Sequence, residues 1–316
     1  MGGSIWFPLL AFVTTAPHGR TLSAPTFGWA TQLTGSNNIH TDGLAPDGAG
    51  GAIVAGHFKG TATFGSTTLT SSGLFDGYVA RLDSSGSVSW AVRYGGASAV
   101  STYSAAADGS GGAWVVGSFE GSATFGSSTL TSAGGADMFV FSVDSSGSIG
   151  WAVSASGSDA VVPRSVAADG TGGLLVVGRF KVSATFGSTT LTSSGNSDLY
   201  VARLTSLGAF SWAVNAGSSS DLVRGYAVAP DGSGGALVTG SFMGTATFGS
   251  TTLTASGTNE DVYVLRIDSS GSVSWAIRMG SSLRDRGRGI AADDAGGAFV
   301  TGYFKDTGNC SPRPHA

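Results

Sequence analysis

Short apolar runs separated by glycine-rich turns return along this chain at a nearly constant spacing. In one stretch the runs cover residues 103–107, 113–119, 138–143 and 148–153, and each has the length of a strand. The second and third runs are rich in β-branched and aromatic residues, which favour strands over helices. The pattern therefore predicts four strands in each repeat of about 61 residues.

Aromatic residues mark the same repeat. Trp29, Trp90, Trp151 and Trp212 are spaced by 61 residues, and Trp275 follows after a further 63. A second aromatic residue stands inside each copy of the phrase ATFG, at Phe64, Phe125, Phe186 and Phe248. Self-similarity at a fixed long period is typical of repeat architectures.

The turns between the runs indicate how the strands are connected. Asp-Gly-x-Gly-Gly stands between the first and second runs, at residues 108–112 and 231–235, and Asp-Ser-Ser-Gly stands between the third and fourth. Aspartate caps its own backbone in such turns, and glycine supplies the positive φ angle that tight hairpins need. Four antiparallel strands joined as a meander and repeated around an axis form a β-propeller blade.

We therefore predict an all-β fold, a β-propeller of four-stranded antiparallel blades. A β-solenoid or an array of β-sandwiches fits less well, because solenoid coils are about 20–30 residues long and no linker separates these units. The first run, with the small residues Ala105, Ala106 and Ala107, suits the crowded centre of the ring. The tryptophan of the fourth run is expected to pack between neighbouring blades.

Four complete units run from about residue 40 to residue 277, and a fifth is split between the two ends of the chain. Residues 289–304 would supply its first two strands and residues 28–33 its fourth. We expect five blades in a single domain over residues 25–305, closed by pairing of the N-terminal strand with the C-terminal blade. The alternative is a piece of a larger propeller. Residues 306–316 leave the repeat and are expected to form an irregular tail.

The N-terminal residues 1–24 allow two interpretations. Residues 5–13 form an apolar run of nine, which is too short to span a bilayer. The run could be the core of a secretory signal, or it could be an extra strand that supplies the missing third strand of the split blade. Pro8 would confine such a strand to a sheet edge.

The unit at residues 225–277, GYAVAPDGSGGALVTGSF followed by DVYVLRIDSSGSVSWAI, resembles the bacterial-type beta-propeller repeat family. The resemblance extends over about residues 27–304. The chain departs from the family pattern in turns only, with Gly-Gly where the family often has Gly-Asn and with Thr205 at one turn aspartate. The resemblance implies a propeller fold in an extracellular or cell-surface protein, with no agreed activity.

Composition narrows the classes of function. Charged residues make up 11% of the chain, the net charge is −4, and only three lysines are present. Without a basic run, binding to nucleic acid phosphates is not expected. Cys310 is the single cysteine, so neither an intramolecular disulfide nor a cysteine-based metal site can form.

The chain offers no recognisable catalytic motif. Its four histidines, His18, His40, His57 and His315, show no metal-ligand spacing. No Gly-x-Ser-x-Gly motif stands with suitable Asp and His partners, and the Gly-x-Gly matches lack a following helix. We therefore predict no catalytic residues, no metal and no cofactor.

Aspartates recur at two positions of the repeat, where the two candidate roles are calcium binding and turn capping. Calcium loops gather several carboxylates within about a dozen residues, whereas each turn here offers one, which favours turn capping. Arginines inside the third run are expected to lie opposite the aspartates. The first aspartate series is Asp47, Asp108, Asp169, Asp231 and Asp293, the second is Asp76, Asp137, Asp198 and Asp261, and the arginines are Arg81, Arg203 and Arg266.

The connections from the fourth run to the next first run differ between copies, whereas the other connections are nearly alike. Variation on a constant scaffold is where a binding surface can form. Counting five residues back from each first-series aspartate gives a ring at the entry of the innermost strand, namely Asp42, Tyr103, Arg164, Tyr226 and Arg288. Tyrosine and arginine suit sugars, carboxylates or peptides. The alternative is a set of solvated polar residues at the channel mouth.

These observations predict a non-enzymatic binding or structural module with a protein or glycan partner, no nucleic acid and no membrane span. One alternative is a lectin-like propeller that binds glycans. Another is a hydrolase or lyase with a site in the central channel.

Overall fold

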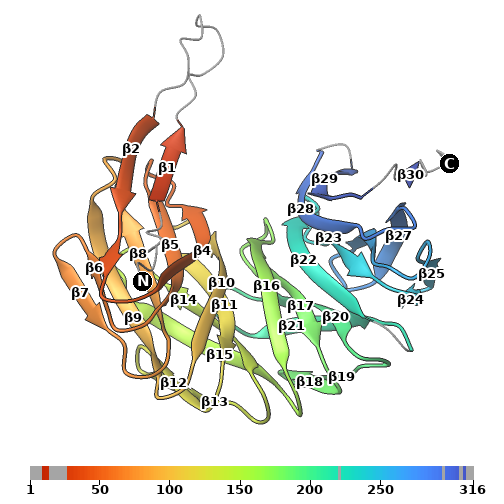
Figure 1. Ribbon diagram of the computed structural model, residues 1–316, viewed down its shortest axis with the longest axis horizontal. Coiled ribbons are helices and arrows are strands. Elements are labelled where there is room, and N and C mark those ends of the chain that lie inside the picture. The colour runs from red at the N-terminus through yellow and green to blue at the C-terminus, as the bar shows by residue number, and fades with distance from the viewer. Residues whose placement is uncertain (1–8, 14–26, 220–221, 294–295, 306–308, 311–316) are drawn as a thin grey trace, which may run out of the picture.

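Every regular element in the described part of the chain is a β-strand (Figure 1). The computed structural model describes residues 9–13, 27–219, 222–293, 296–305 and 309–310. This confirms the predicted all-β class. Over the same residues, no helix has the length and apolar character needed to cross a membrane.

Each complete repeat forms a four-stranded antiparallel sheet, or blade, with its strands in chain order. The first blade contains β4 (Ile39–Pro46), β5 (Ala52–Phe58), β8 (Asp76–Leu82) and β9 (Val88–Gly96). The second contains β10 (Val100–Ala107), β11 (Ala113–Phe119), β14 (Asp137–Val143) and β15 (Ile149–Gly157). The third contains β16 (Val161–Ala168), β17 (Leu174–Phe180), β20 (Asp198–Leu204) and β21 (Phe210–Ala216). The fourth contains β22 (Val223–Pro230), β23 (Ala236–Phe242), β26 (Asp261–Ile267) and β27 (Val273–Gly280).

The two central strands of each blade are buried on both faces because neighbouring blades cover them. All seven residues of β11 and of β23 are buried. One core cluster joins Trp114 and Val116 of the second blade to Leu174 and Val176 of the third. Burial on both faces explains why these runs are continuously apolar rather than alternating.

The ATFG phrase forms the inner half of a small outer hairpin that ties one blade to the one before it. Strand β12 pairs with β9, and β18 pairs with β15. The phenylalanines Phe64, Phe125, Phe186 and Phe248 are fully buried beneath these hairpins. The hairpin strands are β6 (Thr61–Phe64), β7 (Thr67–Thr70), β12 (Ser122–Phe125), β13 (Ser128–Thr131), β18 (Ser183–Phe186), β19 (Thr189–Thr192), β24 (Thr245–Phe248) and β25 (Thr251–Thr254).

The repeated tryptophan packs between neighbouring blades, as predicted. The indole Nε1 of Trp90 donates to the carbonyl of Ser145 at 2.9 Å, and that of Trp151 donates to Ser206 at 2.9 Å. The Trp90 ring lies over Gly147, where φ is +89° and an added Cβ would come within 2.8 Å of the ring. Trp29, Trp90, Trp151 and Trp212 are each seated on the turn between the third and fourth strands of the next blade, at Gly86, Gly147, Gly208 and Gly271.

The first strand of each repeat is innermost, also as predicted. Strands β4, β10, β16, β22 and β28 (Arg286–Ala292) follow one another along the inside of the arc of blades (Figure 1). The backbone N–H of Val166 approaches Ser104 Oγ at 3.3 Å, which joins β16 to β10. Small side chains allow this close approach.

The split fifth blade is not assembled. Strand β28 pairs with β29 (Ala298–Tyr303), and β1 (Leu9–Val13) pairs with β2 (Phe27–Gln32), in two separate sheets at opposite ends of the arc (Figure 1). Among the described residues, no strand pairing joins the two hairpins. Each is anchored to its own neighbour, because Trp29 lies against Gly86 of the first blade and β28 contacts β22. Ring closure, and with it the count of five blades, stays a prediction.

Both hairpins nevertheless keep the register of a blade. The shift between Gly287 and Gly289 in β28 repeats the one between Gly225 and Ala227 in β22. In β1–β2 the register shifts at the position that is irregular between the third and fourth strands of complete blades. After β2, β3 (Thr34–Gly35) pairs with β6 as the end of β9 pairs with β12.

The tail also contains an element of the repeat. Strand β30 (Asn309–Cys310) pairs with the end of β27, through Gly280↔Asn309. In the complete repeats this edge is occupied by an outer hairpin, as in the pair Gly95↔Thr124. Residues 306–308 and 311–316 of the expected irregular tail lie outside the described residues, as do residues 1–8 and 14–26 of the N-terminal segment.

Replacing Trp151 with alanine is expected to lower the free energy of unfolding by about 2–3 kcal/mol, because the ring is half-buried between blades. Leu207→Ala is the matched control, since Leu207 stands in the turn that Trp151 covers but is 82% exposed. Urea unfolding would measure both. Equal effects of the two substitutions would contradict this role of the tryptophan.

Candidate functional site

The five predicted ring residues all stand at one irregularity of the innermost strand. In β10 the pairing with β11 passes from Thr102↔Gly117 to Ser104↔Val116, and Tyr103 is skipped. The same step skips Asp42, Arg164, Tyr226 and Arg288 in the other inner strands. A β-bulge of this kind re-aims the side chain of the extra residue. The structure therefore places the five residues at one level of the inner wall.

A glycine in the second strand makes room for each bulge. A Cβ added to Gly56 would lie 1.9 Å from the carbonyl oxygen of His40, and one added to Gly240 would lie 1.8 Å from that of Arg224. Any side chain there would collide with the backbone of the innermost strand. This explains why every second run contains glycine at this position.

Four of the ring residues form two stacked pairs across blade boundaries. The guanidinium carbon of Arg164 lies 4.9 Å from the centroid of the Tyr103 ring, and that of Arg288 lies 4.5 Å from the Tyr226 centroid. These are cation–π distances. The pairs hold both arginines against the wall, and they cover one face of each tyrosine.

The fifth ring residue, Asp42, belongs to a different cluster. Its Oδ2 lies 3.0 Å from Nδ1 of His57, and the His57 ring stacks on His40 with centroids 4.7 Å apart. His40 and His57 are direct cross-strand partners in β4 and β5. Sequence spacing alone did not reveal this pairing, although the register of the two strands would have placed the histidines opposite each other.

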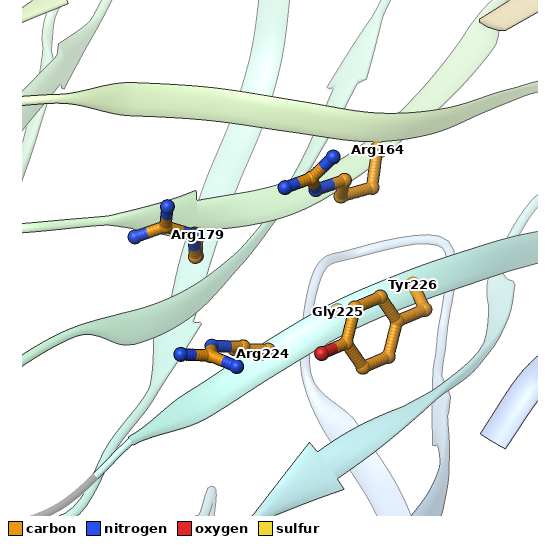
Figure 2. Close-up of a pocket in the computed structure, with 5 residues that line it drawn as sticks. All are labelled: Arg164, Arg179, Arg224, Gly225 and Tyr226. Atoms are coloured by element: carbon orange, nitrogen blue, oxygen red, sulfur yellow. The ribbon is translucent and has the colours of Figure 1, made fainter. Parts of the chain in front are cut away.

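Two ring residues, Arg164 and Tyr226, also line a cavity of about 190 Å³. Its other lining residues are Arg179, Arg224 and Gly225. Figure 2 shows the guanidinium of Arg164 directed towards Arg179, and the hydroxyl of Tyr226 directed towards Arg224. Neither Arg179 nor Arg224 belongs to the ring expected from the sequence. The available signal was the departure of Arg179 from the other complete repeats, which carry His57, Ser118 and Ser241 at its position. Arg224 gives a weaker signal, because Arg286 stands at the equivalent position of the last repeat.

The cavity has an excess of positive charge. Arg224 Nη1 lies 3.2 Å from Oε1 of Glu260, which is buried and also binds Arg286 and Arg284. Glu260 is the only carboxylate that pairs with any of the three cavity arginines in the described part of the chain. Burial and repulsion from Arg224 and Arg164 lower the pKa of Arg179. Burial alone would raise the pKa of Tyr226, but interactions with Arg224, Ser241 and Arg286 together outweigh it and lower the pKa.

The first series of recurring aspartates caps turns. Oδ1 of Asp169 accepts from the backbone N–H of Thr171 at 2.7 Å and of Gly173 at 2.8 Å. Arg203 lies 2.7 Å from the other oxygen, and Arg81 and Arg266 bind their turn aspartates in the same way. The predicted opposition of arginine and aspartate is confirmed.

The second series is fully buried and holds the loop before the third strand. Asp76, Asp137, Asp198 and Asp261 each accept a hydrogen bond from a backbone N–H four or five residues earlier. Within the described ranges, no group of three or more His, Cys, Asp or Glu side chains could hold a metal ion. The carboxylates at both positions are thus engaged by backbone and arginine donors.

Comparisons with known proteins give little further information. No family profile matches the chain, and no curated protein matches it. Among solved structures, the chain is similar to a protein of unknown function from Bacteroides caccae, with 12% identity over 80% of this chain and 85% of that one. The TM-score is 0.38, so this similarity carries no argument about function.

Replacing Asp169 with asparagine is expected to lower the free energy of unfolding by about 1–2 kcal/mol at pH 7. Burial would raise the pKa of Asp169, but hydrogen bonds from Thr171, Gly173 and Arg203 outweigh it and lower the pKa below 3.8. A lowered folded-state pKa means that the carboxylate stabilises the fold above about pH 4, and that this contribution is lost as the pH falls further. Urea unfolding at pH 7 and pH 3 should show the difference from the unsubstituted protein shrinking in acid.

Asp108→Asn is the matched control for this experiment. Asp108 caps the equivalent turn through Ser110 and Gly112, but Ser142 stands where the other repeats have arginine. The control should therefore lose less stability at pH 7. Equal losses would show that the arginine contributes nothing.

Proposed function

We propose that this protein is a non-enzymatic binding module that takes its ligand at the channel mouth, on the ring of Asp42, Tyr103, Arg164, Tyr226 and Arg288. The observation that carries the proposal is the shared bulge. Five inner strands turn their extra residue to one level, and these residues differ although the surrounding repeats are alike. A constant backbone with variable side chains is the arrangement expected of a recognition surface.

Other observations support the proposal. The connections that lead into the inner strands vary between copies, while the turns at the other end are uniform. The resemblance to the beta-propeller repeat family supports an extracellular or cell-surface location. The negative net charge and the scarcity of lysine favour a protein or glycan partner over nucleic acid.

The two alternatives receive less support. Arg164 and Arg288 cover the ring faces of Tyr103 and Tyr226, which limits the stacking that a lectin uses for neutral sugars. A hydrolase or lyase that used the Asp42–His57 pair as its general base would also need a nucleophile within hydrogen-bond distance of the histidine. In the described chain the polar partner of His57 is Asp42, and no nucleophile–base hydrogen bond involves this histidine.

The test is a glycan array and a pull-down from native surface proteins, each with the unsubstituted protein and with the Arg164→Ala, Arg288→Ala double variant. We expect saturable binding that the double variant loses, because both arginines lie in the ring. The control is Lys59→Ala, Lys181→Ala, which removes the same charge from residues outside the ring. Binding that the double variant retains would place the ligand elsewhere and refute the proposal.

A further inference from the structure

We infer that Arg164, Arg179 and Arg224 form a binding site for an oxyanion group with two negative charges, of the sulfate, phosphate or dicarboxylate kind. The inference rests on the proposed function, because it names the chemistry of the group that the channel mouth would hold. Guanidinium groups donate paired hydrogen bonds to such oxyanions and keep their charge at every physiological pH.

The three arginines are fixed by strands rather than by loops. Arg164 and Arg179 lie on the paired strands β16 and β17 of the third blade, and Arg224 is the second residue of β22 in the fourth. The bulge at Arg164 directs its side chain towards the same cavity (Figure 2). A site of this kind is preorganised, so that little conformational entropy is lost when a ligand binds.

The charge in the cavity is the second argument. Of the three guanidinium groups, Arg224 alone has a carboxylate partner among the described residues, and that partner is Glu260. Two positive charges are therefore left for a ligand to neutralise. Basic composition does not explain this excess, because the whole chain carries a net charge of −4.

Apart from Arg288, which stacks on Tyr226, the arginines elsewhere in the described chain pair with carboxylates. Arg81, Arg203 and Arg266 pair with turn aspartates, and Arg93 and Arg278 pair with the buried Asp76 and Asp261. Pairing is thus the rule where arginine has a structural role. Arg179 departs from it, since it is partly buried and its described charged neighbours are other arginines.

Arg224, which lines the cavity, also has an unused donor. Arg224 Nε is buried and has no hydrogen-bond partner in the described part of the protein. A buried donor without a partner costs free energy, which an acceptor oxygen placed beside it would recover. The same oxygen would reduce the repulsion among the three guanidinium groups.

The size of the cavity limits what can enter. Its volume of about 190 Å³ is below the roughly 300–1,000 Å³ of sites that enclose a drug-sized ligand. One anionic group fits, while the remainder of a larger ligand would stay in the channel mouth. The stacked arginines on Tyr103 and Tyr226 make charge, rather than ring stacking, the basis of recognition.

The experiment is isothermal titration calorimetry of the full chain with sodium sulfate, sodium phosphate and sodium malonate at pH 7.5, with sodium acetate as the monoanion. Sodium chloride keeps the ionic strength equal, because exposed charges are screened by salt. We expect saturable binding of the dianions. The affinity for acetate should be lower by about tenfold or more, corresponding to the loss of one charge contact. The three dianions together show whether tetrahedral or planar groups are preferred.

Arg179→Gln should weaken the preferred dianion by about tenfold or more, since it removes one of the two unneutralised charges. Arg179 forms no described ion pair with Glu260 and belongs to neither stacked pair, so the fold should be retained, and thermal unfolding checks this. Lys59→Ala, Lys181→Ala is the control for charge alone and should bind as the unsubstituted protein does. Equal heats for acetate and the dianions, no binding of any dianion, or full affinity in Arg179→Gln would each overturn the inference.

These outcomes are separable from failure of the proposed function. A partner captured through Arg164 and Arg288, with no binding of any dianion, would leave the binding module in place and refute the anion site. Dianion binding that depends on Arg179, with no partner lost in the Arg164→Ala, Arg288→Ala variant, would support the anion site and refute the wider ring.

Discussion

Contact between the fourth strand of one blade and a turn of the next controls the geometry of this molecule. The central strands of a blade are apolar on both faces, so a blade cannot bury its own surface and depends on its neighbours. The tryptophan on the fourth strand, seated over a turn glycine and bonded to a turn carbonyl, fixes how far each blade rotates relative to the next. That rotation brings the innermost strands close enough for contacts such as Val166 with Ser104. The level and spacing of the inner-wall side chains follow from it.

The bulge in the innermost strand places different demands on the backbone and on the side chain of the extra residue. Its backbone needs glycine at the facing position, because any Cβ at Gly56 or Gly240 would meet a carbonyl oxygen. It places no comparable demand on the extra residue, whose side chain leaves the sheet. Aspartate, tyrosine and arginine all occupy the position without changing the register. The fold can therefore keep its strands constant while the chemistry of the inner wall varies.

The sequence was sufficient to predict the features that recur from one unit to the next. Strand positions, the turn aspartates, the innermost strand and the interblade tryptophan all follow from local pattern, and counting from the turn identified all five bulge residues. Contacts between unlike positions of different blades were not predictable. The approach of Arg224 to Arg179 depends on the angle between two blades, and Glu260 comes from a connection that differs from its counterparts. The pairing of β30 with β27 was also missed, because backbone pairing needs no sequence motif.

The sign of the charge differs along the inner wall, and this difference would constrain the orientation of a ligand. On the first blade Asp42 lies against His57, whereas on the third and fourth blades three arginines face one cavity. If a ligand were anchored at the arginines by an anionic group, the rest of the ligand would extend along the wall. The part that reached the first blade would there meet the carboxylate of Asp42. Few substitutions are needed for this polarity, since the position of Arg179 holds His57, Ser118 and Ser241 in the other complete blades. Because the backbone is the same in each blade, orientation of a ligand at the mouth depends on these side chains and not on the shape of the scaffold.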